Sequence, residues 1–458
     1  MGLFAVMFMI VGTTLVNPTT AADVKEPVFK GKPLSAWVEQ LSDRSANARQ
    51  AAAVALAKMG DAAKPAIGPL IAALGDTDDS VRDTAAETLS LFGKQVIGPL
   101  TGALKHPDAQ VRRGAAQAIS HMGADAGEAV GALIVVLKDD LNPDVRETAA
   151  YALAAIGPAA KDAVEPLAAV AVGKDANLHG PALMALGGIG KAAVPALVKL
   201  LNEKAPDVRV GALLALALVG RGAKEAVEPL IVLLKDDDVE VRFSAAAALG
   251  SIATDGPEAV GPLAGALHDK EAKVRTQAAE SLGRFGVEAV GGVGALIESL
   301  KDGNKDVSRT AADALGAIGP AAKDAAPALT ALLKDNDPVL RAKAAAALGR
   351  IGPSAQSATA ALIVALMDTT SDSVAANAAR ALGKIGPGAK DAVPALVELA
   401  KDERSPIREA AITALGGIGP DAKGAAPVLR AALKDKDVYI RTAAVNALRR
   451  VEKTENKE

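Results

Sequence analysis

The chain repeats a pattern of apolar and polar positions that predicts pairs of amphipathic helices. In the segment PALTALLKDNDPVLRAKAAAALGRIG, residues 327–352, apolar residues recur at intervals of three and four on both sides of a short polar turn. Such spacing places the apolar side chains on one face of each helix. A helix pair this short cannot bury its apolar face alone, whereas stacked pairs can. The pattern therefore predicts a stack of helix pairs.

One phrase, V-R-x-x-A-A-x-A-L-G, marks the second helix of each unit. Ten of the twelve intervals between consecutive copies are 33 or 34 residues long, and two are 30. The position that usually holds Arg, which we call the index position, lies at Arg49, Arg82, Arg112, Arg146, His179, Arg209, Arg242, Arg275, Ser308, Arg341, Ala375, Arg408 and Arg441. These thirteen copies predict an all-α fold, an α-solenoid of about thirteen two-helix repeats over residues 33–452.

Residues that favour helix ends bound each second helix. Four positions before the index, ten units carry a side chain that can accept hydrogen bonds from free backbone N–H groups. These are Ser45, Asp78, Asp108, Asn142, Asp175, Asp238, Asn304, Asp337, Ser371 and Asp437. Eleven positions after the index, eleven units carry Gly, as in ALGAIGP at 314–320, and we expect these glycines to take the left-handed conformation that ends a helix. The first helix of each unit is expected to be 10–13 residues long, with a Pro in its opening turn.

The units resemble HEAT repeats, and most closely the short bacterial type known as phycobilisome-lyase-like HEAT repeats. The resemblance covers about residues 33–452, and GKPLSAWVEQL at 31–41 resembles the start of exported bacterial HEAT proteins. It implies that one side of the second helices faces a concave surface. It implies little about activity, because this architecture serves many roles.

The recurring Arg at the index position has two interpretations. Helical geometry places it at the margin of the packed face, which favours a structural role over phosphate or carboxylate binding. The resemblance implies a ladder of Asp–Arg contacts between neighbouring repeats. Its cations would be Arg49, Arg82, Arg112, Arg146, Arg209, Arg242, Arg275, Arg341, Arg408 and Arg441, and its carboxylates Asp43, Asp76, Asp140, Asp236, Asp269, Asp302, Asp335, Asp402 and Asp435. We expect interruptions where the index residue is His179, Ser308 or Ala375.

Composition narrows the possible chemistry. The 458 residues include no Cys, so zinc–thiolate sites and Cys nucleophiles are excluded, and the four His are never followed by Glu. The paired His-Glu steps of the HEAT-repeat hydroxylase are therefore missing, and we assign no catalytic, metal or cofactor residues. An enzyme of the bilin-lyase or hydroxylase type stays an alternative by family resemblance only. A net charge of −3 and 2% aromatic residues disfavour nucleic acid as a partner.

The N-terminal segment predicts export. Residues 3–16 are mostly apolar, and small residues follow near Ala21 and Ala22, which is typical of a signal peptide over residues 1–22. We expect a periplasmic or extracellular location, with an uncleaved N-terminal tether as the alternative. Residues 23–32 are assigned to a short linker and 453–458 to a polar tail. No later segment is expected to be long and apolar enough to span a membrane, so we expect no membrane insertion after signal cleavage.

The positions opposite the packed face of the second helices indicate where a partner would bind. Charges are mixed along most of this face, but apolar residues replace them in units four to seven. We call these residues the apolar patch: Tyr151, Met184, Val210, Leu214, Leu218 and Phe243. Tight packing against neighbouring helices is the alternative explanation. The sequence thus favours a non-catalytic scaffold that binds a protein or peptide, with a purely structural envelope array as a further alternative and the oligomeric state left open.

Overall fold

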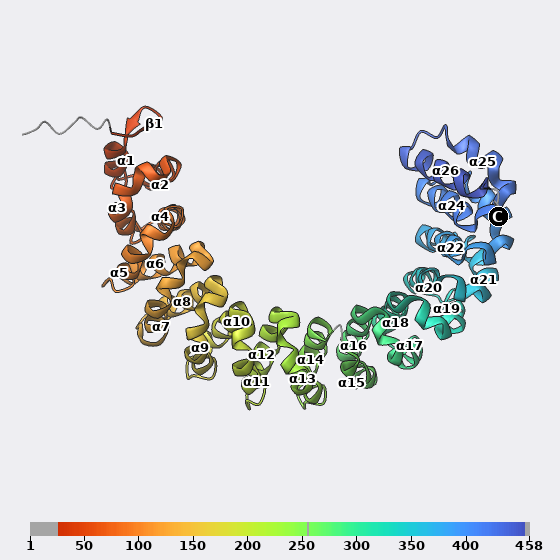
Figure 1. Ribbon diagram of the computed structural model, residues 1–458, viewed down its shortest axis with the longest axis horizontal. Helices are drawn as coiled ribbons and strands as arrows, with labels where there is room; N and C mark the ends of the chain where they lie inside the picture. The colour runs from red at the N-terminus through yellow and green to blue at the C-terminus, as the bar shows by residue number, and fades with distance from the viewer. Residues whose placement is uncertain (1–25, 254–255, 454–458) are drawn as a thin grey trace, which may run out of the picture. The chain divides into compact units, whose positions relative to one another are not determined.

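The computed structural model describes residues 26–253 and 256–453 of the chain (Figure 1). The chain divides between His121 and Met122 into two compact units, unit 1 and unit 2. Both are stacks of helix pairs, and the described residues contain thirteen such pairs, from α1 to α26. The predicted all-α solenoid of two-helix repeats is confirmed. The signal-peptide assignment for residues 1–22 lies outside the described residues.

Unit 1 begins with a small hairpin and continues as three helix pairs. Most second helices are joined to the following first helix by a 3-10 segment. The elements are β1 Val28–Phe29, β2 Lys32–Pro33, α1 Leu34–Gln40, α2 Ala46–Met59, η1 Gly60–Ala66, α3 Ile67–Ala73, α4 Asp79–Ser90, η2 Gly93–Val96, α5 Ile97–Ala103 and α6 Ala109–Met122.

Unit 2 contains the remaining ten pairs. Its first helices are α7 Val130–Asp139, α9 Val164–Ala171, α11 Val194–Leu200, α13 Val227–Leu233, α15 Val260–Ala266, α17 Val293–Ser299, α19 Ala326–Leu332, α21 Thr359–Ala365, α23 Val393–Leu399 and α25 Ala426–Ala432. Its second helices are α8 Pro143–Ile156, α10 His179–Ile189, α12 Pro206–Val219, α14 Val239–Ile252, α16 Ala272–Phe285, α18 Lys305–Ile318, α20 Pro338–Ile351, α22 Asp372–Ile385, α24 Ser405–Ile418 and α26 Val438–Val451.

The 3-10 segments of unit 2 are η3 Gly123–Ala129, η4 Gly157–Ala163, η5 Ala176–Leu178, η6 Gly190–Ala193, η7 Gly220–Ala226, η8 Pro257–Ala259, η9 Gly286–Gly292, η10 Gly319–Ala325, η11 Gly352–Ala358, η12 Gly386–Ala392 and η13 Gly419–Ala425. The first helices are shorter than predicted. Most have seven α-helical residues, because the segment before them winds as a 3-10 turn. The two 30-residue intervals contain the short segments η2 and η6, which have four residues each.

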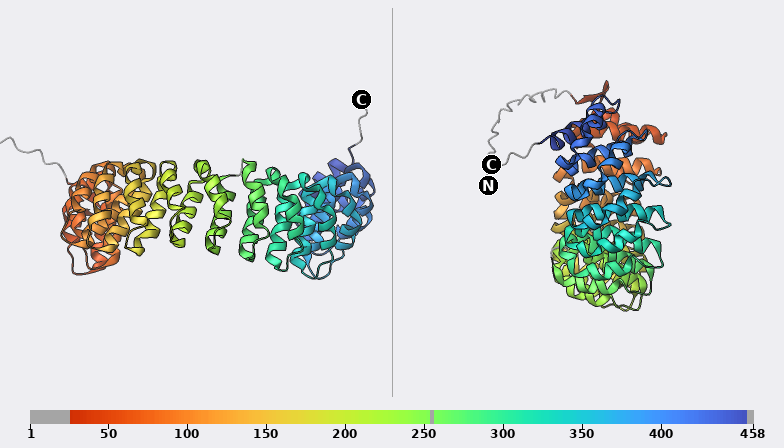
Figure 2. Two further views of the ribbon diagram at one scale, coloured as in Figure 1. Left: turned by 90° about the horizontal axis from the view of Figure 1, so that it is seen from below. Right: turned by 90° about the vertical axis from the view of Figure 1, so that its right-hand side faces the viewer.

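The helices of unit 2 form two layers. Successive second helices pack on one another from α8 to α26 and form what we call the second-helix layer, while the first helices lie on its other side (Figures 1 and 2). The core lies between the layers and between the pairs. In α14, for example, Val241, Ala245 and Leu249 are completely buried. Alanines such as Ala245 let neighbouring helices approach closely, so the alanine-rich pattern is a packing requirement.

The ends of the second helices follow the predicted residues with two differences. Asp and Asn at the predicted cap positions accept bonds from backbone N–H groups, as Asp238 does from Glu240, but Ser45 and Ser371 make no such bond. Gly319 has φ +71° and ψ −137°. This conformation lies outside the left-handed helical region that was predicted, and it is one that only Gly adopts easily.

The assignment of residues 23–32 to a linker is wrong for its described part. Val28 pairs with Pro33 and Phe29 with Lys32 in an antiparallel hairpin. The indole N–H of Trp37, on α1, donates to the carbonyl of Phe29 at 3.1 Å, and the Lys32 ammonium lies 4.7 Å from the Trp37 ring centre. Hydrogen bonding and cation–π attraction therefore attach the hairpin to the first helix pair.

Two helical runs, Ala109–Asp139 and Ala176–Leu200, are long and apolar enough by composition to cross a membrane, contrary to the sequence-based expectation. Each run contains a glycine with positive φ, Gly123 or Gly190, where one helix ends and a 3-10 turn begins. A solenoid needs apolar faces on both helices that flank such a turn, so the repeat accounts for the length and composition of these runs.

Candidate binding face

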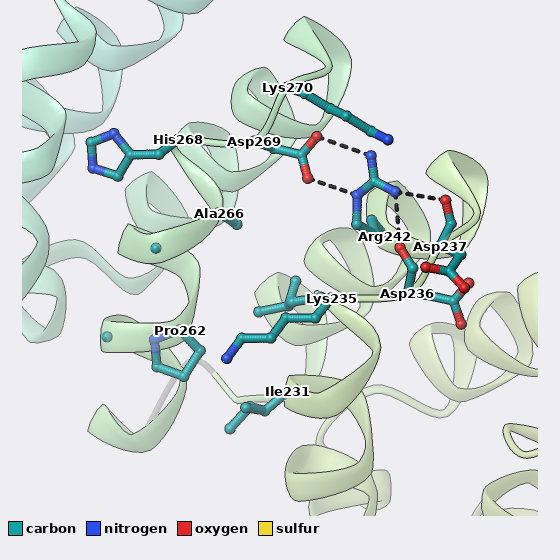
Figure 3. Close-up of a pocket in the computed structure, with 13 residues that line it drawn as sticks. Ile231, Lys235, Asp236, Asp237, Arg242, Pro262, Ala266, His268, Asp269 and Lys270 are labelled. Carbon is teal, nitrogen blue, oxygen red and sulfur yellow. Dashed lines mark hydrogen bonds and ion pairs between the residues drawn. The ribbon is translucent and has the colours of Figure 1, made fainter.

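The index arginines fix the turns between helix pairs. Arg242 is 4% exposed and lies at the start of α14. Its Nε and Nη2 donate to the Asp269 carboxylate at 2.7 and 3.1 Å, and its Nη1 donates to the carbonyls of Asp236 and Asp237 at 2.9 and 3.0 Å (Figure 3). Asp236 belongs to the same pair as Arg242, whereas Asp269 belongs to the next one. One side chain thus joins two consecutive turns by charge-assisted bonds.

The same contact recurs along both units. The ion pairs between an index arginine and a carboxylate of the next pair are Arg49–Asp76, Arg146–Asp175, Arg209–Asp236, Arg242–Asp269, Arg275–Asp302, Arg341–Asp368 and Arg408–Asp435. The bond from Arg275 holds the pKa of the Asp302 carboxyl below its ordinary value, and Arg49 does the same to Asp76. These carboxylates also accept a backbone N–H two residues later, as Asp302 does from Asn304.

Two of the three expected interruptions are filled by other arginines. Next to Ser308, Arg309 donates to Asp337 at 2.7 Å, and the Asp337 side chain is 4% exposed. Near Ala375, Arg404 contacts Asp372 at 2.6 Å and Asp402 at 2.8 Å. The expectation of a break at these units is therefore wrong.

At the third unit, His179 Nε2 lies 2.8 Å from the Gly173 carbonyl, which it contacts as an index arginine would. Its Nδ1 is buried without a hydrogen bond and lies 3.8 Å from the exposed Asp207 carboxylate. Because these two turns share no closer ion pair in the described residues, we still expect the step from α10 to α12 to be a weak one.

Other members of the predicted ladder make contacts within their own units. Arg82 pairs with Asp79 of its own helix, because His106 occupies the position where the next unit would offer Asp. Arg441 donates to the carbonyls of Asp435 and Lys436. The Arg112 guanidinium donates to the carbonyls of His106 and Pro107. The carboxylates of Asp43, Asp140, Asp335 and Asp402 each accept a backbone N–H of their own turn.

The apolar patch is accessible. Tyr151, Met184, Leu214 and Leu218 are 38%, 53%, 58% and 64% exposed, and Val210 and Phe243 are half-buried. These residues lie on α8, α10, α12 and α14, which are consecutive helices of the second-helix layer. Complete burial between helices, the alternative from sequence, is not what the structure shows. The Leu218 side chain reaches over Gly187 of α10, so the patch is continuous between these two helices.

A cleft of about 700 Å³, which was not predicted from the sequence, lies between α13 and α15 (Figure 3). Ile231 and Pro262 line its apolar side, and Lys235, His268 and Lys270 line its polar side. The Arg242 and Asp269 side chains beside them are bonded to each other. The helix before this cleft, α14, ends at Ala253 instead of the usual Gly, which is the one sequence signal of an irregular connection.

Two smaller hollows lie on the second-helix layer over α16, α18, α20 and α22. Both are lined by Asp313 and Arg350, and one also by Lys343. Arg284 and Arg350, each nine residues after an index arginine, were not among the residues predicted from the sequence. In residues 26–253 and 256–453, no three His, Asp or Glu side chains gather closely enough to hold a metal ion.

Stacked helix pairs, turns joined by bonded arginines and one open helical layer define a helical-repeat protein of the α-solenoid class. The sequence matches the family described as HEAT repeats over residues 34–120, 97–187, 194–283, 293–368 and 359–449. The chain belongs to the HEAT-repeat family. No curated protein matches the sequence.

Solved karyopherin structures share the fold. A crystal structure of importin beta aligns with a TM-score of 0.62 and 16% identity over 91% of this chain and 62% of that chain. Kap95p in complex with RanGDP aligns with a TM-score of 0.65 and 14% identity over 92% and 67%. Kap121p bound to Pho4p aligns with a TM-score of 0.61 and 16% identity over 91% and 53%. The chain thus spans about half of the length of Kap121p.

Proposed function

We propose that this protein is a non-catalytic scaffold that binds a protein or peptide on its second-helix layer, through the apolar patch. The observation that carries the proposal is the exposure of Tyr151, Met184, Leu214 and Leu218 on three consecutive helices. Each exposed apolar side chain costs free energy in water, and a contiguous group of them usually marks an interaction site. Met and aromatic residues are common in such contacts.

The family and its structural neighbours support this proposal. Kap121p is described in complexes with Nup53p and Pho4p, and Kap95 in complexes with Nup1 and RanGDP. These are protein partners bound by helical-repeat chains. In the present chain, an amphipathic helix or an extended segment with apolar side chains would fit the patch, because the patch crosses several helices of one layer.

The decisive experiment combines capture with a matched surface control. Full-length protein is immobilised and exposed to the native envelope fraction, in three forms: wild type, Leu214→Asp with Phe243→Asp, and Val232→Asp with Val364→Asp. The control residues are exposed apolar side chains of α13 and α21, in the first-helix layer. We expect a protein that is retained by the wild type and the control but lost by the patch variant.

Retained capture by the patch variant would refute the assignment of the patch, provided that circular dichroism shows equal helicity in all three forms. Affinity of the purified partner is then measured by calorimetry, and we expect at least about a tenfold loss for the patch variant. Stoichiometric iron or chromophore in the purified protein would refute the non-catalytic part of the proposal and favour the hydroxylase or bilin-lyase alternative.

Export and repeat subtype are part of the same proposal. The apolar stretch and small residues of 1–22 support a cleaved signal peptide and a periplasmic or extracellular location, and the resemblance of 31–41 to exported phycobilisome-lyase-like HEAT proteins supports it too. Intact mass spectrometry of the protein from its native cells tests this. We expect a chain that begins at Ala22 or Asp23, and a chain that retains residues 1–22 would favour the membrane tether.

A further inference from the structure

The second-helix layer has a polar groove beyond the apolar patch. Its two hollows, each with a volume of about 450 Å³, adjoin one another because both are lined by Asp313 and Arg350. Small residues are among those that line them, including Gly283, Ala317 and Ala346. The groove crosses α16, α18, α20 and α22, all within unit 2. Because small residues line it, the backbone of an extended peptide could approach these helices closely.

Ion pairing leaves unpaired positive charge in and beside this groove. Glu280 is neutralised by Arg284 at 2.7 Å, and Asp313 by Lys343. Arg350, Arg380 and Lys384 are exposed and take part in no ion pair within the described residues. The charges that look mixed along the sequence therefore consist of two ion pairs and three cations that can bind a ligand.

Close packing brings these cations together. A Cβ on Gly349 would lie 2.9 Å from the Cα of Ala381, so α20 and α22 are in contact beside Arg350 and Arg380. Lys384 follows Arg380 by one helical turn, which places both on one side of α22. A Cβ on Gly316 would lie 3.2 Å from Arg350 Cδ, so the Arg350 stem extends over α18 toward the first hollow.

We infer that this groove binds an extended peptide segment rich in Asp or Glu. Complementary charge is the argument: Arg350 lines the groove without an ion pair in the described residues, and Arg380 and Lys384 add exposed positive charge on α22 beside it. The groove's own two carboxylates are already paired. At roughly 8–10 Å between neighbouring helices, the four helices span about 30 Å, the length of about nine or ten extended residues. A peptide is favoured over a nucleic acid because no aromatic side chain among the residues that line the two hollows offers a stacking surface for bases. The inference rests on the proposed scaffold function, and it adds that the partner carries an acidic segment.

A synthetic probe tests the inference directly. The probe is a fluorescein-labelled peptide of alternating Glu and Ser, about twelve residues long to cover the span of the groove. Fluorescence anisotropy is measured against the full chain. We expect saturable binding that weakens with added salt, because exposed charges are screened. The same peptide with Gln in place of Glu should not bind.

One triple variant and one double variant locate the binding. Arg350→Gln with Arg380→Gln and Lys384→Gln should weaken peptide binding by about tenfold or more. Lys390→Gln with Lys423→Gln removes exposed cations of η12 and η13 and should change it by less than about twofold. Equal loss in both variants, or no binding by the wild type, would overturn the inference. Equal or tighter binding of an oligothymidylate that the triple variant also loses would assign the groove to single-stranded nucleic acid instead.

The outcome is separable from that of the apolar patch. Leu214→Asp with Phe243→Asp leaves Arg350, Arg380 and Lys384 in place, so it should retain the acidic peptide even if it loses the natural partner. If the triple variant binds the peptide as well as the wild type does, the groove is excluded while the patch assignment stands. If the peptide binds as expected but the patch variant still captures the natural partner, the patch is excluded and the groove stands.

Discussion

Replacement of Arg242 by Ala should uncouple two neighbouring helix pairs. The substitution removes two bonds to the Asp269 carboxylate and two to the carbonyls of Asp236 and Asp237. A charge-assisted bond contributes about 1.5–3 kcal/mol, but the Asp269 carboxylate keeps its bond from the backbone N–H of Glu271 and gains water. We therefore expect a net loss of about 2 kcal/mol in the free energy of local opening, which is less than the sum of the four bonds.

Hydrogen exchange monitored by mass spectrometry is the suitable assay, because a long repeat array does not unfold as one two-state system. A loss of about 2 kcal/mol accelerates exchange about 30-fold. The acceleration should appear in α14, α15 and α16 and not in α22 to α26. Arg441→Ala is the matched control, since Arg441 bonds to carbonyls only and to no following pair. It should have a smaller effect.

Unchanged exchange around Arg242 would refute the role of the ladder in coupling the pairs. If partner binding were lost while exchange stayed unchanged, Arg242 would be assigned a role in partner binding instead of a structural one. Arg242→Lys adds a sharper comparison, because Lys keeps the charge but cannot form the paired contact with Asp269. We expect exchange in this variant between the wild type and Arg242→Ala.

Further expected outcomes concern pH and the helix ends. The pKa of Asp302 is lowered in the folded state from an ordinary value of 3.8, so its contribution to stability is complete above that value and is lost as the pH falls through the lower folded pKa. The melting temperature, measured by circular dichroism, should therefore fall steeply below about pH 4. Asp302→Asn should make this fall smaller. Gly319→Ala should destabilise the α18–α19 connection by about 1–3 kcal/mol, because Ala is strained at φ +71°. Gly294→Ala, at an open position in the first turn of α17, should be neutral or stabilising by up to about 1 kcal/mol in the same melt.

The fold could be predicted from the sequence because the same helix-pair pattern recurs in every unit. Caps, stop glycines and apolar spacing agree in each unit, so an irregularity in one copy does not obscure the others. The conformation of the stop glycines was less predictable. Sequence shows that Gly319 needs positive φ, but its ψ depends on how the following 3-10 turn packs on the next pair.

The site was predictable only where it follows the repeat. The exposure of Leu214 and Met184 follows from their helical positions, which the sequence fixes relative to the packed face. The ladder contacts of Arg309 and Arg404 could not be predicted from the repeat, because neither residue stands at an index position. The acidic-peptide groove was hidden for a related reason. Net charge along a helix does not reveal that Lys343 neutralises Asp313 of the neighbouring helix while Arg350 keeps its charge available.

The weak step at His179 has a consequence for how a partner is accommodated. Met184 lies on α10, before this step, and Leu214 and Leu218 lie on α12, after it. Where strong ion pairs join the turns, adjacent helices keep a fixed spacing. At His179 the two pairs are held mainly by apolar packing, which allows small sliding movements at low energetic cost. The apolar patch therefore straddles the most compliant joint in its part of the stack, so a single scaffold could adjust the spacing of its anchor residues to partners of different size.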